Sequence, residues 1–234
     1  MDPIKDARAV VEELHPGARA AFLCGSVMTD RRTANSDLDI VVVLDGEPAP
    51  YRLSVRERGW PVELLVHTEE TWNAFVDREV PLRSSPLMSM CAGGTLLFDT
   101  DGVGARLKAR AEALVAAGPA PMPEAEVEDR RYALTDLLDD LTSCTDPGEL
   151  LFISTEIARR TAELALVVHN SWNGAAKWLA RRLDEVAPGL AVRLHGAVRQ
   201  ALDGRTEPLV AVVDEVLDQA GGRLWAGYRR SGKP

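Results

Sequence analysis

The sequence predicts an α+β protein, with an N-terminal domain built on a mixed β-sheet flanked by helices and a C-terminal helical bundle. Strand-like and helix-like apolar patterns alternate over the first half of the chain, whereas helical spacing dominates the second half. Between them, the stretch AAGPAPMPE at 116–124 holds three prolines and a glycine, which favours a linker over a helix. We therefore expect domains at 1–117 and 124–234.

The elements of the N-terminal domain follow from the spacing of apolar residues. Val41, Val42 and Val43 form an unbroken apolar run, which is typical of a strand covered on both faces. Thr68 is a predicted helix N-cap, because acidic residues occupy the turn that follows it. The predicted strands are 19–24, 38–44, 62–66 and 95–98, and the predicted helices are 4–14, one that begins at 68–70, and 101–117.

The C-terminal half reads as a set of about five helices joined by short loops. Helices of this length with short connections favour an antiparallel bundle. Pro147 fits the first turn of its helix, where a missing backbone N–H costs nothing. The predicted helices are 124–141, 147–169, 172–186, 190–202 and 207–219.

Composition narrows the classes of function and location. The 234 residues carry a formal net charge of −9 and 46% of them are hydrophobic, which indicates a globular chain. This acidity disfavours a long nucleic-acid substrate, because nucleic-acid binders usually carry a basic face. No apolar run approaches the roughly 20 residues of a membrane span, and the N-terminus lacks a secretory core. The three cysteines have neither zinc-site nor paired disulfide spacing, so we expect a cytoplasmic protein.

One segment carries residues suited to chemistry. Gly25-Ser26 follows an apolar strand, and glycine lets a backbone approach a ligand closely while serine adds a hydroxyl. Asp37 and Asp39 stand at the start of the next strand, where residues two apart point to the same side. Two adjacent carboxylates repel unless a cation relieves them, and Mg²⁺ prefers such oxygen ligands together with substrate phosphates. We also expect Ser36, which directly precedes Asp37, to be part of the cofactor-binding site.

A third acid lies in the following strand. Glu63 stands among apolar neighbours in the run PVELLV, where a carboxylate needs a partner or a metal unless its face is exposed. If this strand lies beside 38–44, Glu63 reaches the same site. A phosphate-binding turn with metal-holding acids predicts phosphoryl or nucleotidyl transfer.

This layout resembles the DNA polymerase β-like nucleotidyltransferase superfamily, and most closely the antibiotic nucleotidyltransferases that act on aminoglycosides or lincosamides. The resemblance covers about 45 residues, from Leu23 to Val66. It implies that Gly25 and Ser26 hold the triphosphate of ATP or another NTP. It also implies that Asp37 and Asp39 bind two Mg²⁺ ions, with Glu63 as a third ligand or as the base.

The resemblance implies an enzyme that transfers a nucleoside monophosphate, AMP in the first instance, to a hydroxyl of a small molecule such as an antibiotic. One position departs from the pattern: Asp30 stands where many relatives have glycine, followed by Arg31 and Arg32. Aspartate tolerates a left-handed turn better than most residues, so the loop can survive.

Two other readings stay open. Minimal nucleotidyltransferases of toxin–antitoxin systems adenylylate a partner protein, although they are usually free-standing. The N-terminal domain could also bind nucleotide without turnover, a reading that the three retained acids Asp37, Asp39 and Glu63 disfavour.

The C-terminal half adds weaker candidates. Lys177 could meet triphosphate charge, and beside it Trp178 could stack on a base, but a surface lysine next to a core tryptophan is an equally good reading. Asp136, Asp139 and Asp140 share one helix face, which suits either an acidic wall for a cationic acceptor or a solvated surface.

Overall fold

A computed structural model describes residues 2–231 of the chain. The chain forms two compact units that divide after Pro119, within the stretch that carries the prolines. Unit 1 contains the β-sheet and unit 2 is helical throughout its regular structure. The α+β architecture predicted from the sequence, a mixed sheet with helices followed by a helical bundle, is confirmed.

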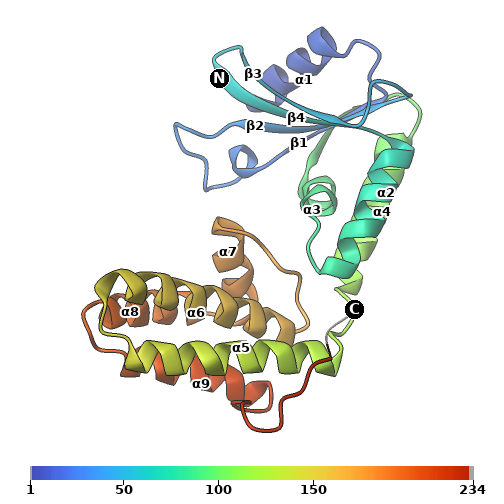
Figure 1. Ribbon diagram of the computed structural model, residues 1–234. Coiled ribbons are helices and arrows are strands. Elements are labelled where there is room, and N and C mark those ends of the chain that lie inside the picture. The colour runs from blue at the N-terminus through green and yellow to red at the C-terminus, as the bar shows by residue number, and fades with distance from the viewer. Residues whose placement is uncertain (1, 232–234) are drawn as a thin grey trace. The chain divides into compact units, whose positions relative to one another are not determined.

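Unit 1 is organised around a five-stranded sheet with the strand order β3-β4-β2-β1-β5 (Figure 1). The central strands β2 and β4 run parallel, while every other neighbouring pair is antiparallel, so the sheet is mixed. Parallel pairing of β2 with β4 fits the apolar run in β2, whose residues are buried from both faces. The strands are β1 (Ala20–Cys24), β2 (Leu38–Leu44), β3 (Tyr51–Glu57), β4 (Trp60–Thr68) and β5 (Thr95–Asp99).

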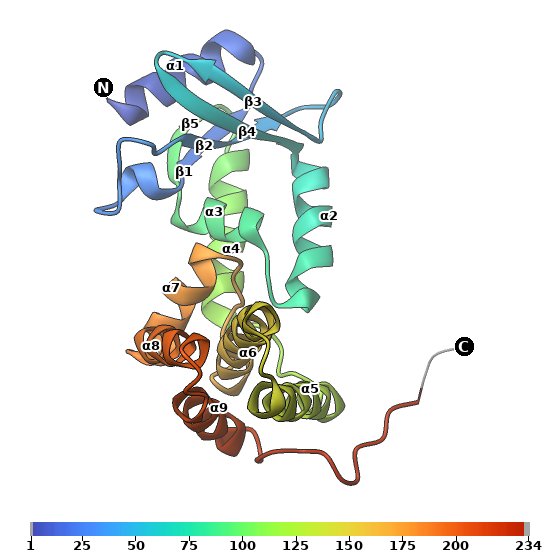
Figure 2. The ribbon, with the colours of Figure 1, turned by 60° about the vertical axis from the view of Figure 1, so that its left-hand side comes forward.

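Helices cover both faces of this sheet (Figures 1 and 2). One face packs against α1, where Leu38, Ile40 and Val42 join a core cluster with Val10 and Val11 of the helix. The opposite face is covered by the other three α-helices of unit 1. The helices of unit 1 are α1 (Pro3–Leu14), α2 (Glu69–Glu79), α3 (Pro86–Gly93) and α4 (Val103–Ala117), with short 3₁₀ turns at η1 (Ser26–Met28) and η2 (Val80–Leu82).

Local capping explains where several helices begin. Thr68 is the N-cap of α2, as predicted: its hydroxyl accepts from the backbone N–H of Thr71, and the Thr71 hydroxyl accepts from the N–H of Thr68. Asp146 is the N-cap of α6 (Pro147–Val168), and its carboxylate accepts from the backbone N–H of Glu149.

Two elements of unit 1 were not predicted. Strand β3 shows strict alternation of half-buried and exposed residues, which is the pattern of an edge strand wetted on one face. Its three charged residues and the prolines before it masked that alternation. Helix α3 was missed because its eight residues are mostly apolar with no polar face, although Ser85 provides a clear N-cap.

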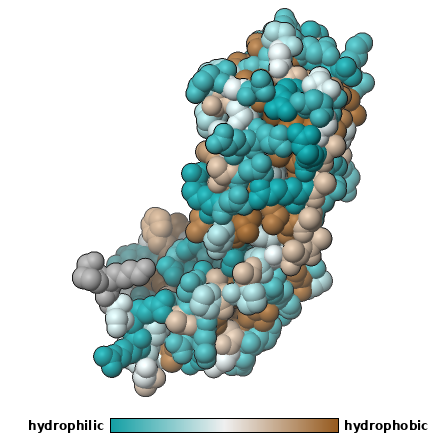
Figure 3. All heavy atoms as spheres, turned by 90° about the vertical axis from the view of Figure 1, so that its right-hand side faces the viewer, coloured by the Kyte–Doolittle hydropathy of each residue, from teal (hydrophilic) through white to brown (hydrophobic). Residues whose placement is uncertain are grey.

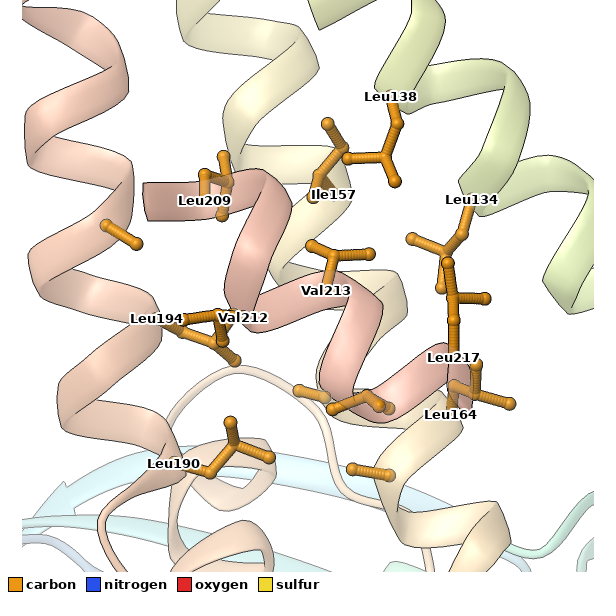
Figure 4. Packing of buried hydrophobic residues seen from close by; sticks show 14 of the residues in the cluster. Leu134, Leu138, Ile157, Leu164, Leu190, Leu194, Leu209, Val212, Val213 and Leu217 are labelled. Carbon is orange, nitrogen blue, oxygen red and sulfur yellow. The ribbon is translucent and has the colours of Figure 1, made fainter. Parts of the chain in front are cut away.

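Unit 2 is a bundle whose core is drawn from all five of its helices. Figure 4 shows leucine, isoleucine and valine side chains from different helices of unit 2 meeting in its interior. Four helices match their predicted ranges closely, whereas α7 begins five residues later than expected. The backbone at Gly174 lies so close to Trp178 that the preceding chain folds back on the first turn of the helix. The helices are α5 (Glu124–Ser143), α6 (Pro147–Val168), α7 (Lys177–Val186), α8 (Leu190–Leu202) and α9 (Glu207–Gln219).

The surface of unit 1 over α2 and α4 is largely hydrophilic (Figure 3). Polar contacts join the two helices. Arg106 of α4 donates hydrogen bonds to both carboxylate oxygens of Glu69, and Arg110 contacts Asn73 and Asp77. In the described part of the chain, no helix combines the length and the apolar character that crossing a membrane requires.

Candidate functional site

The predicted site residues of unit 1 gather where β2 and β4 begin and where β1 ends. These ends share one edge of the sheet, here called the site edge, because β1 runs antiparallel to β2. Cys24 pairs with Asp39, and Asp39 pairs with Glu63 in the parallel register. Residues directly opposite one another in a sheet point to the same face, so Asp39 and Glu63 share a face, as predicted. Asp37, two residues before Asp39, is placed for the same side.

Gly25 makes room for the Asp39 carboxylate. A β-carbon built on Gly25 would lie only 2.2 Å from Asp39 Oδ2, closer than any real β-carbon contact. The backbone at Gly25 also has a φ of +80°, a region that residues with side chains rarely adopt. Both observations require glycine here, and both place the turn after β1 against the second aspartate of the motif.

The loop that follows Gly25 is held by hydroxyl groups. The Ser26 and Ser36 hydroxyls lie 3.3 Å apart, and Ser36 Oγ also accepts from the backbone N–H of Thr33 at 2.9 Å. Ser36 is buried, so it anchors the loop, whereas Ser26 is partly exposed beside Gly25. The Thr29 hydroxyl donates to the Ser26 carbonyl at 2.9 Å, which stabilises the turn that follows Ser26.

Glu63 faces the edge strand β3. It lies opposite Ser54, and its Oε1 is 3.5 Å from Nη1 of Arg52. A depression of about 430 Å³ adjoins it on this side of the site edge. The depression is lined by Asp37, Ser54, Val55, Arg56, Pro61, Val62 and Glu63.

The donor chemistry of this edge suits a hard divalent cation. Asp37 and Asp39 are both partly exposed, and Mg²⁺ in nucleotide sites is commonly held by one or two carboxylates together with substrate phosphates. Within residues 2–231, no three His, Cys, Asp or Glu side chains are grouped closely enough to hold a metal ion by themselves. Asp37 and Asp39 therefore supply at most part of a donor set, and metal binding by Asp37, Asp39 and Glu63 stays a prediction.

A cysteine lies on the same face but does not offer a nucleophile. Burial raises the pKa of the Cys24 thiol far above its usual range, and the neighbouring Cys91 and the charge of Asp39 raise it further. The thiol therefore stays protonated at neutral pH and donates to the Met90 carbonyl. The candidate reactive groups at the site edge are therefore its carboxylates and hydroxyls.

The candidates from the C-terminal half belong to unit 2. Lys177 opens α7 and is exposed, with Trp178 beside it 47% exposed rather than in the core. The acidic trio on α5, Asp136, Asp139 and Asp140, is likewise exposed. Nucleotide binding by Lys177 stays a prediction.

The residues of β3 are the part of the site region that sequence reasoning missed. Ser54 and Arg56 line the depression and Arg52 contacts Glu63, but the strand that presents them was not predicted. The alternation of Tyr51, Leu53 and Val55 with polar residues was the available signal.

Proteins similar to this chain are found among solved structures. No protein-family model matches the chain, and no curated protein matches it. Among solved structures, the chain is similar to a nucleotidyltransferase-like protein from Exiguobacterium sibiricum 255-15, with 14% sequence identity and a TM-score of 0.49. The similarity covers 94% of this chain and 77% of the other. The roles of the site residues must therefore rest on the geometry of this chain.

Proposed function

We propose that this chain is a Mg²⁺-dependent nucleotidyltransferase that moves a nucleoside monophosphate, AMP in the first instance, from an NTP to a hydroxyl of a small molecule. The observation that carries the proposal is the site edge itself. There the Asp39 carboxylate lies against Gly25 and Asp39 is in register with Glu63, while Ser26 follows Gly25 in the chain. A close backbone approach beside paired acids is what binding and cleaving a triphosphate requires.

Each residue has a defined task in this proposal. Gly25 and Ser26 bind phosphate oxygens through backbone and hydroxyl, and Ser36 holds the Ser26 hydroxyl in place. Asp37 and Asp39 would hold the metal. Bound Mg²⁺ stabilises the negative charge that develops on the attacking and leaving oxygens.

The proposed transfer forms one bond to the α-phosphorus and breaks another. The acceptor hydroxyl oxygen forms a bond to the α-phosphorus, and the bond from that phosphorus to the oxygen bridging to the β-phosphate breaks. Pyrophosphate leaves with the electron pair of that bond. Glu63, partly exposed beside the depression, takes the proton of the hydroxyl.

The test is Mg²⁺-dependent pyrophosphate release, measured for the wild type and for Asp39→Ala. Asp45→Ala is the matched control, because Asp45 directly follows β2 at its opposite end and is 92% exposed. We expect release with an acceptor that falls at least about 100-fold in Asp39→Ala and stays near wild type in Asp45→Ala. Absence of any Mg²⁺-dependent NTP binding would overturn the proposal.

The acceptor panel decides between the readings left open. Aminoglycosides and lincosamides test the antibiotic acceptors suggested by the sequence resemblance. NTP binding with no release for any acceptor would favour either a protein acceptor or a nucleotide-binding module. Transfer of labelled AMP to a protein in a cell lysate separates these two.

A further inference from the structure

One charged residue that lines the depression at the site edge has no part in the proposed reaction. Asp37 and Glu63 are its two acidic lining residues, and the proposed function assigns them to the metal and the proton. The charged lining residue that remains is Arg56. It makes no ion pair with any other residue between 2 and 231, so its charge is available to a ligand.

The topology separates this depression from the turn that binds phosphate in the proposal. β1, which ends at Gly25, lies on one side of β2, and β4 and β3 lie on the other side. Asp39 lies against Gly25 of the turn, whereas Asp37 and Glu63 line the depression. A triphosphate bound at the turn would therefore leave the depression to the acceptor.

The edge strand presents its polar residues to that space in a row. Arg52, Ser54 and Arg56 alternate along β3 and are all exposed, and Ser54 and Arg56 lie opposite Glu63 and Pro61 of β4. Arg52 already contacts Glu63, which leaves the Ser54 hydroxyl and the Arg56 guanidinium to recognise a ligand.

We infer that the acceptor is a hydroxyl compound that also carries an anionic group, a phosphate monoester or a carboxylate, and that Arg56 binds this group. The inference rests on the proposed function. Arginine presents a planar set of donors that matches phosphate and carboxylate geometry, and pairing it with an anion at this position fixes which end of the acceptor faces the acids. A polycationic acceptor such as an aminoglycoside would meet a like charge here, so this inference narrows the acceptor class.

The test uses three probes that differ mainly in charge: glucose 6-phosphate, glucose and glucosamine. Side-chain Nε–H signals of the ¹⁵N-labelled full-length chain report on the arginines and are assigned with Arg52→Gln, Arg56→Gln and Arg58→Gln. Arg58→Gln is the matched control, because Arg58 lies two residues beyond Arg56 but contacts Glu13 of α1, on the other side of the sheet. Each probe is added after saturation with Mg²⁺ and a non-hydrolysable ATP analogue.

We expect the Arg56 signal to shift saturably with glucose 6-phosphate, with an affinity about tenfold or more above that for glucosamine. Arg56→Glu should reverse this preference, whereas Arg58→Gln should leave it unchanged. Charged residues on an edge strand also prevent pairing with other chains. Arg56→Glu keeps a charge at that position, so a reversed preference reports recognition and not edge protection.

The outcomes separate this inference from the proposed function. If the ATP analogue shifts the backbone amides of Gly25 and Ser26 but the Arg56 signal does not prefer the phosphate probe, the inference fails and the proposed function stands. If the analogue alone moves the Arg56 signal, Arg56 serves the nucleotide and the inference fails. If no nucleotide binds, the proposed function fails, and with it the assignment of an acceptor.

Discussion

The two edges of the parallel pair β2–β4 use their charged residues differently. At the site edge, the Asp39 carboxylate lies against the turn at Gly25, and Glu63 lines a depression while contacting Arg52 at 3.5 Å. At the opposite edge, here called the far edge, Arg19 contacts Asp101, Asp45 and Glu69, and Arg106 holds Glu69 through two hydrogen bonds. The far edge connects β1, β5, α2 and α4 through satisfied ion pairs, which is a structural use of charge.

The two edges illustrate two uses of charged residues in an acidic protein. A cluster of charges whose members neutralise one another stabilises the fold and has little left for a ligand. Acids placed close together repel one another, and a bound divalent cation relieves that repulsion. The far edge also carries a depression of about 660 Å³, lined by residues that include Arg19, Asp45 and Glu69, yet Arg19 already pairs with both of these acids.

The largest effect on activity should follow from adding a side chain at Gly25, within the site edge. Gly25→Ala places a methyl group against Asp39 at a φ of +80°, so we expect about 1–2 kcal/mol of destabilisation from the backbone. Displacement of the Asp39 carboxylate should reduce pyrophosphate release about 100-fold. Gly46→Ala is the control at the far edge, since nothing lies within 4 Å of a β-carbon built there. Equal activity in the two variants would contradict the role of Gly25.

Breaking the far edge should affect stability and spare chemistry. Arg19→Met leaves Asp101 and Asp45 without their arginine, so we expect the Tm to fall by a few degrees and the effect to shrink at high salt. The KM for ATP and the rate of pyrophosphate release should stay at wild-type values when measured well below the Tm. A selective loss of activity at unchanged Tm would place the far edge in the site.

A smaller effect concerns the pH dependence of stability at the far edge. His67 is the second-last residue of β4 there, buried against Phe75, and burial lowers its pKa below the ordinary 6.5. The unfolded chain then binds a proton more readily than the folded one, so stability is full above pH 6.5 and falls as the pH drops below it. We expect the urea midpoint to decrease between about pH 8 and about pH 5.5. His67→Gln should flatten this slope, whereas the same change at exposed His169 should not.

The smallest effect should come from the exposed pair of Glu69 and Arg106. The hydrogen bond from Arg106 lowers the pKa of Glu69 below 4.5, so the folded state binds fewer protons than the unfolded state. The stabilisation is complete above pH 4.5 and is lost as the pH falls through the lowered pKa. The difference in urea midpoint between wild type and Arg106→Gln should therefore narrow in acid, and a difference that is constant with pH would show that the pair does not act through this charge.

The class of fold and most of the regular elements could be predicted from the amino-acid sequence alone. Apolar periodicity is a local property, so the run in β2, the capped start of α2 and most helices of unit 2 could be predicted within a few residues. The motif spacing likewise predicted that Asp37 and Asp39 stand at the start of one strand and Glu63 in a later one, and the parallel register of β2 and β4 brings Asp39 and Glu63 together.

The surroundings of these acids depend on contacts between residues far apart in the sequence. The contact of Gly25 with Asp39 and that of Arg52 with Glu63 depend on which strands are neighbours, and strand order follows from long-range packing that no local pattern encodes. The edge position of β3 was hidden for the same reason, because its alternating residues are stabilised by pairing with β4 and not by their own propensity. Local sequence thus placed the reactive groups, and the order of the strands determined which charges face them.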